Sequence, residues 1–272
     1  MPKNHLEIIG RFGITGATGT LGRLFIELGH TLSLDISRFC GDICNYEEVS
    51  DWISKGNFDY LIHFAAIVPT GAVEKMPHRA FAVNVGGVIN LLNALSELNQ
   101  RPWFFYASTS HVYRSQYRPI SESDAVNPIT LYGLTKYMGE QVLEKCAHEL
   151  CLPYCIGRIF SFYHPSQAES FLYPVLLKRF CEDNLDYPFI LKGADDVRDL
   201  SPAEEVVQKI YQLCQIQANG IINIGSGKGV LIRDFVQSIA PKYLNIQNGS
   251  EIPPTTLIAD ISRLKTLLSN NA

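Results

Sequence analysis

The sequence predicts an α/β fold built on a doubly wound parallel sheet, with a smaller C-terminal lobe. In the first 160 residues, short β-rich segments alternate with longer segments of helical spacing, a pattern typical of right-handed βαβ units. Residues 58–64 form a largely apolar run, as expected for a parallel strand that is buried on both faces. After residue 160, aromatic and proline-rich segments interrupt the alternation, which indicates a lobe over the carboxyl end of the sheet.

The alternation gives an ordered set of elements. Helical spacing is clearest over residues 78–98, where apolar side chains recur every three or four positions until Asn99 and Pro102 end the helix. The expected strands are 11–15, 31–35, 58–64, 103–107 and 154–159, and the expected helices among them are 19–29, 46–54, 78–98 and 129–150. The second half of the chain is expected to form helices near 168–181, 202–215 and 229–239 and a strand at 221–224. We therefore expect a sheet domain of residues 1–160 and 194–218, and a substrate-binding lobe of residues 161–193 and 219–272.

Composition excludes several classes of protein. The chain has 272 residues and a formal net charge of −4, and it has no run of Lys or Arg that would indicate a nucleic acid or a membrane surface as partner. Its longest strongly apolar stretch, 60–69, is too short to span a bilayer. Its seven cysteines include no CxxC pair, so we expect reduced thiols, no metal site and a soluble cytoplasmic protein.

A glycine-rich motif lies between the first expected strand and helix. Gly16 permits a tight turn, Gly19 lets the backbone approach a pyrophosphate, and Gly22 allows close packing of helix and strand. The free N–H groups of the helix start favour phosphate binding. Residues 13–22, including Thr18, Thr20 and Leu21, therefore predict the phosphate site of a Rossmann-type dinucleotide-binding domain.

The acidic residue that selects the cofactor is expected about 20 residues further on. Asp35 closes the expected second strand at that distance and favours NAD, because a carboxylate binds the 2′-hydroxyl of the adenosine ribose. Ser37 and Arg38 follow directly and could instead receive the 2′-phosphate of NADP. The sequence leaves the choice between NAD and NADP open.

A second group of residues predicts acid–base chemistry. Tyr132 and Lys136 lie one turn apart on the same face of an expected helix, so the ammonium can stabilise the phenolate of a tyrosine that transfers protons. Thr109, at the end of an expected strand, adds a hydroxyl that can hold a carbonyl or alcohol.

Together these residues resemble the extended short-chain dehydrogenases/reductases of the NAD-dependent epimerase/dehydratase type, which act on nucleotide sugars. The specific motifs are TGATGTLG at 15–22, STSHVY at 108–113 and YGLTK at 132–136. Supporting motifs are GDI at 41–43, HFAA at 63–66, NVGG at 84–87, VRDL at 197–200 and INIG at 222–225.

The resemblance implies roles for individual residues. Asp42 and Ile43 are expected at the adenine, and Ala65, Ala66 and Asn84 in the cofactor site. Thr109, Tyr132 and Lys136 match the catalytic triad, with Lys136 also touching the nicotinamide ribose, and Arg198 matches an arginine that contacts the substrate's diphosphate. The resemblance also implies a homodimer through a four-helix bundle formed by the helices at 78–98 and 129–150.

The chain also departs from the family pattern. Only six residues separate Asp35 from Asp42, a compact arrangement that is similar to the dTDP-4-dehydrorhamnose reductase branch. Ser110 and His111 stand where dehydratases of the family have Asp and Glu, so 4,6-dehydration lacks its acid and base. Ser161 replaces a phosphate-binding asparagine of many epimerases.

These features favour reduction of a 4-keto nucleotide sugar by hydride transfer, with Tyr132 as the acid. The alternatives are a 4-epimerase with tightly bound NAD and a non-catalytic cofactor-binding subunit, although retention of Thr109, Tyr132 and Lys136 weighs against the latter. His111 projects from the same strand end as Thr109, and an imidazole can exchange protons near neutrality. We therefore expect His111 to act as an auxiliary acid/base or to bind a sugar hydroxyl, or else only to hydrogen-bond the loop at 112–118.

Overall fold

A six-stranded parallel sheet forms the centre of the computed structural model, which describes residues 10–68 and 70–270. Its order is β2-β1-β3-β4-β5-β9. These strands are β1 (Arg11–Thr15), β2 (Asp35–Arg38), β3 (Tyr60–His63), β4 (Trp103–Thr109), β5 (Tyr154–Ile159) and β9 (Gly220–Ile224). The doubly wound α/β fold is confirmed. Because the winding reverses between β1 and β3, ligands are expected at the carboxyl ends of these two strands.

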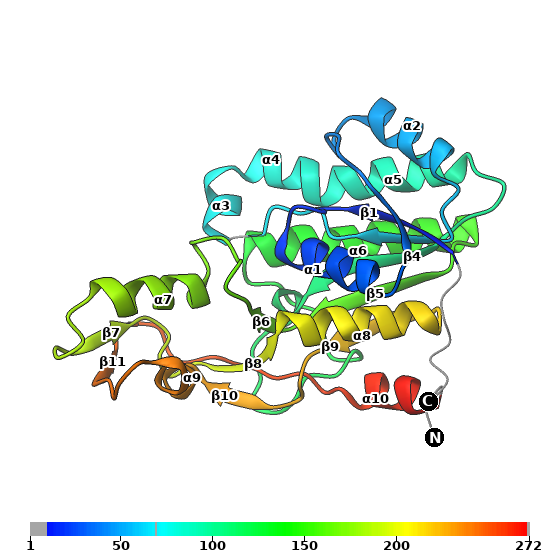
Figure 1. The fold of residues 1–272 in the computed structure, drawn as a ribbon. Helices are drawn as coiled ribbons and strands as arrows, with labels where there is room; N and C mark the ends of the chain where they lie inside the picture. The colour runs from blue at the N-terminus through cyan, green and yellow to red at the C-terminus, as the bar shows by residue number, and fades with distance from the viewer. Residues whose placement is uncertain (1–9, 69, 271–272) are drawn as a thin grey trace, which may run out of the picture.

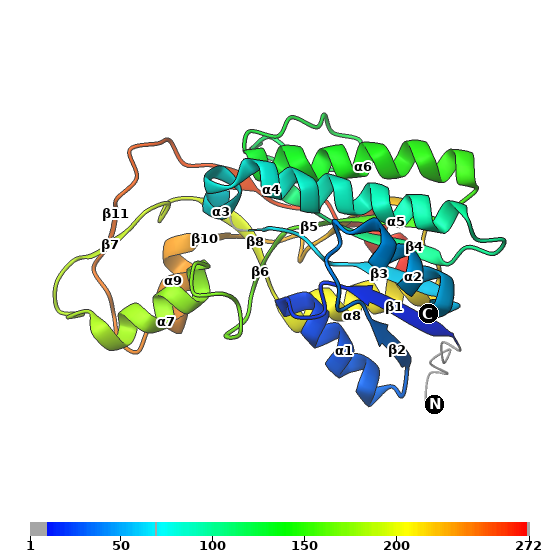
Figure 2. The same cartoon turned by 90° about the horizontal axis from the view of Figure 1, so that it is seen from above.

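Helices cover both faces of the sheet (Figures 1 and 2). On one face, α1 (Thr20–Thr31) packs against α8 (Ala203–Gln215) around Phe25, Phe105 and Ile210. On the other face lie α2 (Tyr46–Gly56), α5 (Gly87–Ser96) and α6 (Leu131–Leu150), packed around a core that includes Ile53, Leu95 and Leu143. The two apolar layers explain why the central strands are apolar on both faces.

The helix expected at 78–98 is interrupted. It is formed by α4 (Pro77–Phe81), a π-helical segment (Ala82–Gly86) and α5, and α3 (Thr70–Lys75) precedes it. π-helical turns inside α-helices are frequent at functional sites. Here the segment carries the buried Asn84.

The C-terminal lobe lies beyond the carboxyl ends of the sheet (Figures 1 and 2). Its own core packs α7 (Leu172–Glu182) with α9 (Ile232–Ile239) around Leu176 and Val236. The lobe's strands are β6 (Ser161–Tyr163), β7 (Phe189–Leu191), β8 (Val197–Pro202), β10 (Gly229–Leu231), β11 (Ile246–Asn248) and β12 (Thr256–Leu257), and α10 (Ser262–Ser269) returns to β9.

Two sequence-based boundaries are corrected. The strand expected at 31–35 begins only at Asp35, because α1 continues to Thr31 and the chain then turns through Ser33, whose φ is 57°. The Leu34 N–H donates to Gly29 O (2.9 Å) and closes that turn. The segment 220–224, expected in the lobe, is β9 and pairs with β5 inside the central sheet. Across the described residues, no helix is both long and apolar enough to cross a membrane.

Candidate active site

The glycine turn lies at the switch point between β1 and β3. Gly16 has a φ of +71°, and a Cβ there would lie 2.5 Å from Ala65 N. A Cβ on Gly22 would lie 2.2 Å from Gly16 O, so Gly22 allows α1 to start directly against the turn. Both positions require glycine because a Cβ atom would collide with the protein's own backbone. Gly16 thereby lets the turn pack against the segment that follows β3.

Gly19 differs from these two glycines. It has ordinary extended backbone angles, and a Cβ there would meet only Gly16 O, at 3.4 Å. It precedes Thr20, the first residue of α1, and no side chain caps this helix start. The first N–H groups of a helix have no partner within the helix. Open space above Gly19 and uncapped N–H groups at Thr20 and Leu21 fit the pyrophosphate of a dinucleotide, and Thr18 lies exposed in the same turn.

The strand register moves Asp35 away from this turn. Asp35 is the first residue of β2, pairs with Arg11 at the start of β1, and has its carboxylate 3.4 Å from Arg11 Nε. The carboxyl end of β2 instead carries Arg38, which is exposed and pairs with Ile14. Asp35 therefore lies at the amino end of the sheet and cannot bind a ribose next to the glycine turn. The expectation that Asp35 binds the ribose hydroxyl is wrong.

The loop after β2 holds the residues expected at the adenine. The Asp42 carboxylate accepts hydrogen bonds from Cys44 N (3.0 Å) and forms an ion pair with Arg79 on α4 (3.0 Å). The Cys44 N–H and the Arg79 guanidinium lower the pKa of Asp42, so its carboxylate is charged and already paired. The Ile43 side chain is buried in the core against Gly87, so it positions the loop instead of presenting an apolar surface to a ligand.

Asn84 positions neighbouring segments. Its amide accepts from Ile67 N (2.7 Å) and donates to Ile67 O (3.0 Å) and Thr135 Oγ1 (3.0 Å). The side chain is fully buried, so the expected direct contact with a cofactor is not supported by this geometry. Asn84 instead ties the chain after Ala65 and Ala66 to α6, which carries Tyr132 and Lys136.

Thr109, Tyr132 and Lys136 meet at the carboxyl end of β4, and all three are buried. The Thr109 hydroxyl accepts from His111 N (3.2 Å) and lies close enough to the Tyr132 hydroxyl to favour its ionised form. Burial raises the pKa of Tyr132 to about 12, so the phenol is protonated at neutral pH. Burial also lowers the pKa of Lys136 to about 7, and the nearby Glu140 opposes that change. Burial outweighs any stabilisation of the phenolate by Lys136, so the lysine does not bring the pKa of Tyr132 near neutrality here.

Close packing fixes where α6 begins. Thr130 caps the helix by accepting from Gly133 N (3.0 Å), and a Cβ on Gly133 would lie 2.2 Å from His111 O. The start of the helix therefore rests directly on the 3₁₀ turn Ser110–Val112, which follows Thr109. This contact holds the strand-end hydroxyl and the helix tyrosine together.

A buried ion pair behind Lys136 was not predicted from the sequence. Glu140, one helical turn after Lys136, binds Arg158 of β5 through three contacts of 2.7 to 3.2 Å and accepts from the Ser108 hydroxyl. Arg158 also donates to the Tyr113 hydroxyl (2.8 Å), which donates to Asn223 (2.9 Å). The sequence does contain a signal for this ion pair: Glu140 lies four residues after Lys136 and eight after Tyr132, on the same face of the helix.

His111 and Arg198 lie near enough for the guanidinium to affect the pKa of the imidazole. The His111 ring contacts the Tyr132 ring edge-on, with centroids 5.6 Å apart. Burial and the Arg198 guanidinium lower the pKa of His111, so the imidazole is neutral near pH 7. Arg198, on β8, is held by Asp196 (2.9 Å) and by Thr255 O and Oγ1 (both 2.8 Å). Arg198 therefore forms an ion pair with Asp196, and this pair would compete with a diphosphate for the guanidinium.

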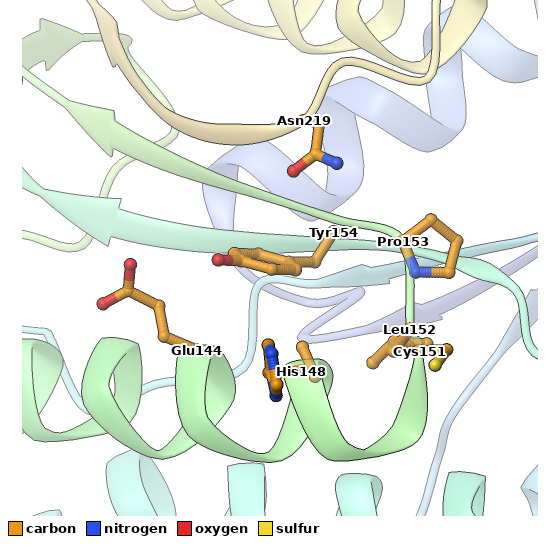
Figure 3. A pocket seen from close by; sticks show the side chains of 8 residues that line it. Glu144, His148, Cys151, Leu152, Pro153, Tyr154 and Asn219 are labelled. Atoms are coloured by element: carbon orange, nitrogen blue, oxygen red, sulfur yellow. The ribbon is translucent and has the colours of Figure 1, made fainter.

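A separate groove of about 490 Å³ lies at the opposite, amino end of the sheet (Figure 3). Glu144 and His148 reach it from α6, Tyr154 from the start of β5, and Asn219 from the residue before β9. It contains none of the residues expected to bind a cofactor or a substrate. This groove is therefore separate from the candidate catalytic residues at the carboxyl end.

Similarity to known proteins extends over most of the chain. The family model of GDP-mannose 4,6 dehydratase matches residues 13–252. A UDP-glucose 4-epimerase from Mycoplasma pneumoniae is 27% identical over 284 aligned residues, covering 90% of this chain and 82% of the epimerase. A dTDP-4-dehydrorhamnose reductase from Shigella flexneri is 33% identical over 144 residues, covering 51% of this chain and 48% of the reductase.

The fold also matches solved structures. RMD from Pseudomonas aeruginosa, complexed with NADPH, superposes with a TM-score of 0.86 at 20% identity, covering 96% of this chain and 93% of RMD. At this identity the match supports the architecture, and the chemistry must be argued from the site.

Proposed function

The chain belongs to the GDP-mannose 4,6 dehydratase family, among the extended short-chain dehydrogenases/reductases that modify nucleotide sugars, and we propose that it reduces the 4-keto group of a nucleotide sugar with a nicotinamide cofactor. The observation that carries this proposal is the buried Tyr132, which lies next to the Thr109 hydroxyl and one turn from Lys136. Its raised pKa keeps the phenol protonated, which is the form that a reduction requires.

Each residue has a definite role in this reaction. A reduced nicotinamide dinucleotide, held by its pyrophosphate at the glycine turn, would supply the hydride. As hydride adds to C4, the electron pair of the C=O bond moves to oxygen, and Tyr132 donates its hydroxyl proton there. The Thr109 hydroxyl orients the same oxygen. The Lys136 ammonium stabilises the tyrosinate that remains, until solvent returns the proton.

His111 and Arg198 are proposed to hold the substrate. A neutral imidazole next to Tyr132 can bind a sugar hydroxyl, and its lowered pKa favours this over a charged acid. The Arg198 guanidinium suits a diphosphate, provided that it exchanges part of its hydrogen bonding to Asp196 and Thr255 for the ligand. A His111→Asn variant, assayed for solvent deuterium exchange next to the carbonyl, separates the two histidine roles. Loss of exchange with reduction intact would indicate proton transfer.

The test is turnover of purified protein with a 4-keto nucleotide sugar and a reduced nicotinamide cofactor. We expect loss of the reduced-nicotinamide absorbance and formation of a 4-hydroxy sugar in equal amounts. The absence of turnover with a range of 4-keto nucleotide sugars, in protein that still binds the cofactor, would favour the non-catalytic subunit.

A second candidate is a 4-epimerase, favoured by the 27% identity with a UDP-glucose 4-epimerase over 90% of this chain. In that case C4 epimers would interconvert without added cofactor, and NAD would be found by mass spectrometry in the purified protein. An epimerase would use Tyr132 first as the base that accepts the C4 hydroxyl proton and then as the acid that returns it.

The proposed assembly is a homodimer through α5 and α6, which lie side by side (Figure 2). Ile89 on α5 and Leu131, Leu134 and Met138 on α6 are each 36 to 39% exposed, although large apolar side chains usually become buried. A Leu134→Glu, Met138→Lys variant should therefore be monomeric by light scattering.

A further inference from the structure

The ammonium of Lys136 lies over the face of an aromatic ring. Its Nζ atom is 4.1 Å from the centroid of the Tyr106 ring on β4, and both side chains are at most 2% exposed. A cation within about 6 Å of a ring centroid is attracted by the negative face of the ring, most strongly where both groups are desolvated. This contact therefore opposes the loss of hydration that burial imposes on the ammonium.

Several contacts fix the position of the Tyr106 ring. Its hydroxyl donates to the main-chain oxygen of Lys136 (3.2 Å). The ring stacks on that of His63, its pairing partner on β3, with centroids 5.8 Å apart. A Cβ on Gly139 would lie 2.2 Å from the Tyr106 hydroxyl oxygen. Glycine inside a helix lowers its stability, and here it leaves the room in α6 that the tyrosine needs.

The next residue on the same face of β4 serves the ion pair behind Lys136. Side chains alternate along a strand, so Tyr106 and Ser108 both face α6. The Ser108 hydroxyl donates to the carboxylate of Glu140, one helical turn after Lys136. Two positions of one strand therefore contact two successive turns of the helix, the ring at the cation and the hydroxyl at the carboxylate.

The groups around Lys136 differ in their effect on its charge. Glu140 raises the pKa of Lys136, but the same carboxylate also pairs with Arg158 (2.7 Å). Burial and the lysine itself lower the pKa of His63 to about 3, so this ring adds no second cation. Burial raises the pKa of Tyr106, so its ring remains a neutral phenol. The ring face and the shared carboxylate are therefore the groups among these that favour the ammonium.

We infer that Tyr106 is a positioning residue, whose ring face holds the Lys136 ammonium in place and keeps it charged next to Tyr132. The inference rests on the proposed function, in which this ammonium stabilises the tyrosinate that remains after proton transfer. The Tyr106 side chain is fully buried, so it acts through the lysine and not on a ligand. Only the charged form of the lysine gains from the ring, so a weaker ring face must lower the pKa of Lys136.

Fluorinated phenylalanines at position 106 test this inference with little change in the shape of the ring. Fluorine withdraws electrons from the ring face, so Tyr106→Phe and its mono-, di- and trifluorinated forms make a graded series. The pKa of Lys136 in the full-length protein is read from the NMR signal of its Cε atom, assigned with Lys136→Met. We expect Tyr106→Phe to keep a pKa close to that of wild type, and the trifluorinated form to lower it by about one unit.

The same fluorinated series at Phe105 is the matched control. Phe105 is the neighbouring residue on β4 and packs in the core on the opposite face of the sheet, so it should leave the pKa of Lys136 unchanged. Turnover gives a second readout. Because reduction requires the ammonium, turnover should fall as the pH rises through the pKa of Lys136, and this fall should move to lower pH along the series at position 106.

The outcomes separate this inference from the proposed function. A ring that only fills the core would change stability along the series without moving the titration of Lys136. An unchanged pKa of Lys136 across the series would therefore overturn the inference and leave the proposed function intact. A graded fall in that pKa, in a protein that reduces no 4-keto nucleotide sugar, would support the contact between ring and lysine, and the proposed function alone would fail.

Discussion

At the reaction end of the proposed cofactor groove, Thr109, Tyr132 and Lys136 are at most 8% exposed, whereas at the adenosine end Arg38 and the Asp42–Arg79 pair face solvent. The first set is held by a helix start packed onto a turn and by a buried ion pair. The second set lies on a strand end and an exposed loop. The side chains of the reaction end are therefore held in place before a ligand binds, whereas those of the adenosine end are held less firmly.

This difference has an electrostatic consequence. Charges and dipoles at the buried end act in a medium of low effective dielectric, so each interaction there is stronger and less sensitive to salt. Charges at the exposed end are screened. Substitutions at the reaction end should therefore affect turnover and stability strongly, and substitutions at the adenosine end should mainly affect cofactor affinity.

The largest effect is expected for Tyr132→Phe. It removes only the hydroxyl that donates the proton, so turnover should fall by ~10²–10⁴-fold while the protein folds and binds the cofactor as before. Tyr137→Phe, on the same helix, is the matched control and should retain wild-type turnover. Steady-state kinetics of both variants check this. Near-normal turnover in Tyr132→Phe would mean that another group supplies the proton.

The next effect tests the buried support of the reaction end. Glu140→Gln removes the carboxylate that pairs with Arg158 and leaves an uncompensated buried cation, which costs about 3–5 kcal/mol of unfolding free energy. Glu149→Gln, which breaks an exposed pair with Lys145 on the same helix, should change stability little. Urea unfolding measures both. Similar small losses in the two variants would show that the buried pair does not stabilise this end.

The reaction end could be predicted from the sequence because its signals are local. Tyr132 and Lys136 are related by helical spacing, and Thr109 by its position at a strand end. The pairing of Glu140 with Arg158 joins α6 to β5, and no local pattern specifies which buried cation a helical carboxylate will meet. The prediction for the adenosine end was wrong for a different reason. Which residue ends β2 depends on where α1 ends. Because the chain turns through Ser33 after α1, β2 begins at Asp35, and Arg38 is the residue at the carboxyl edge of the sheet.

A smaller effect is expected at the glycine turn, which joins the two ends. Gly19→Ala adds a methyl group that meets only Gly16 O at 3.4 Å, so the fold should persist. The methyl group would occupy the space proposed for the pyrophosphate, and we expect cofactor affinity to fall about tenfold or more. Gly16→Ala provides the contrast, because its Cβ would collide with the backbone at Ala65 and the loss should appear in stability. Unchanged cofactor affinity in a folded Gly19→Ala variant would place the phosphates elsewhere.

The smallest effect is expected for Arg198→Lys, in the lobe beyond both ends. The guanidinium satisfies Asp196 and both oxygens of Thr255 at once, and a lysine ammonium cannot reproduce that planar set of contacts. If Arg198 also binds the substrate's diphosphate, KM for the nucleotide sugar should rise severalfold while the affinity for the cofactor stays unchanged. Arg233→Lys, which alters the neighbouring pair with Asp195, controls for a general loosening of the lobe. An unchanged KM together with lowered stability would assign Arg198 to its pairing with Asp196 alone, and the diphosphate would then need another cation.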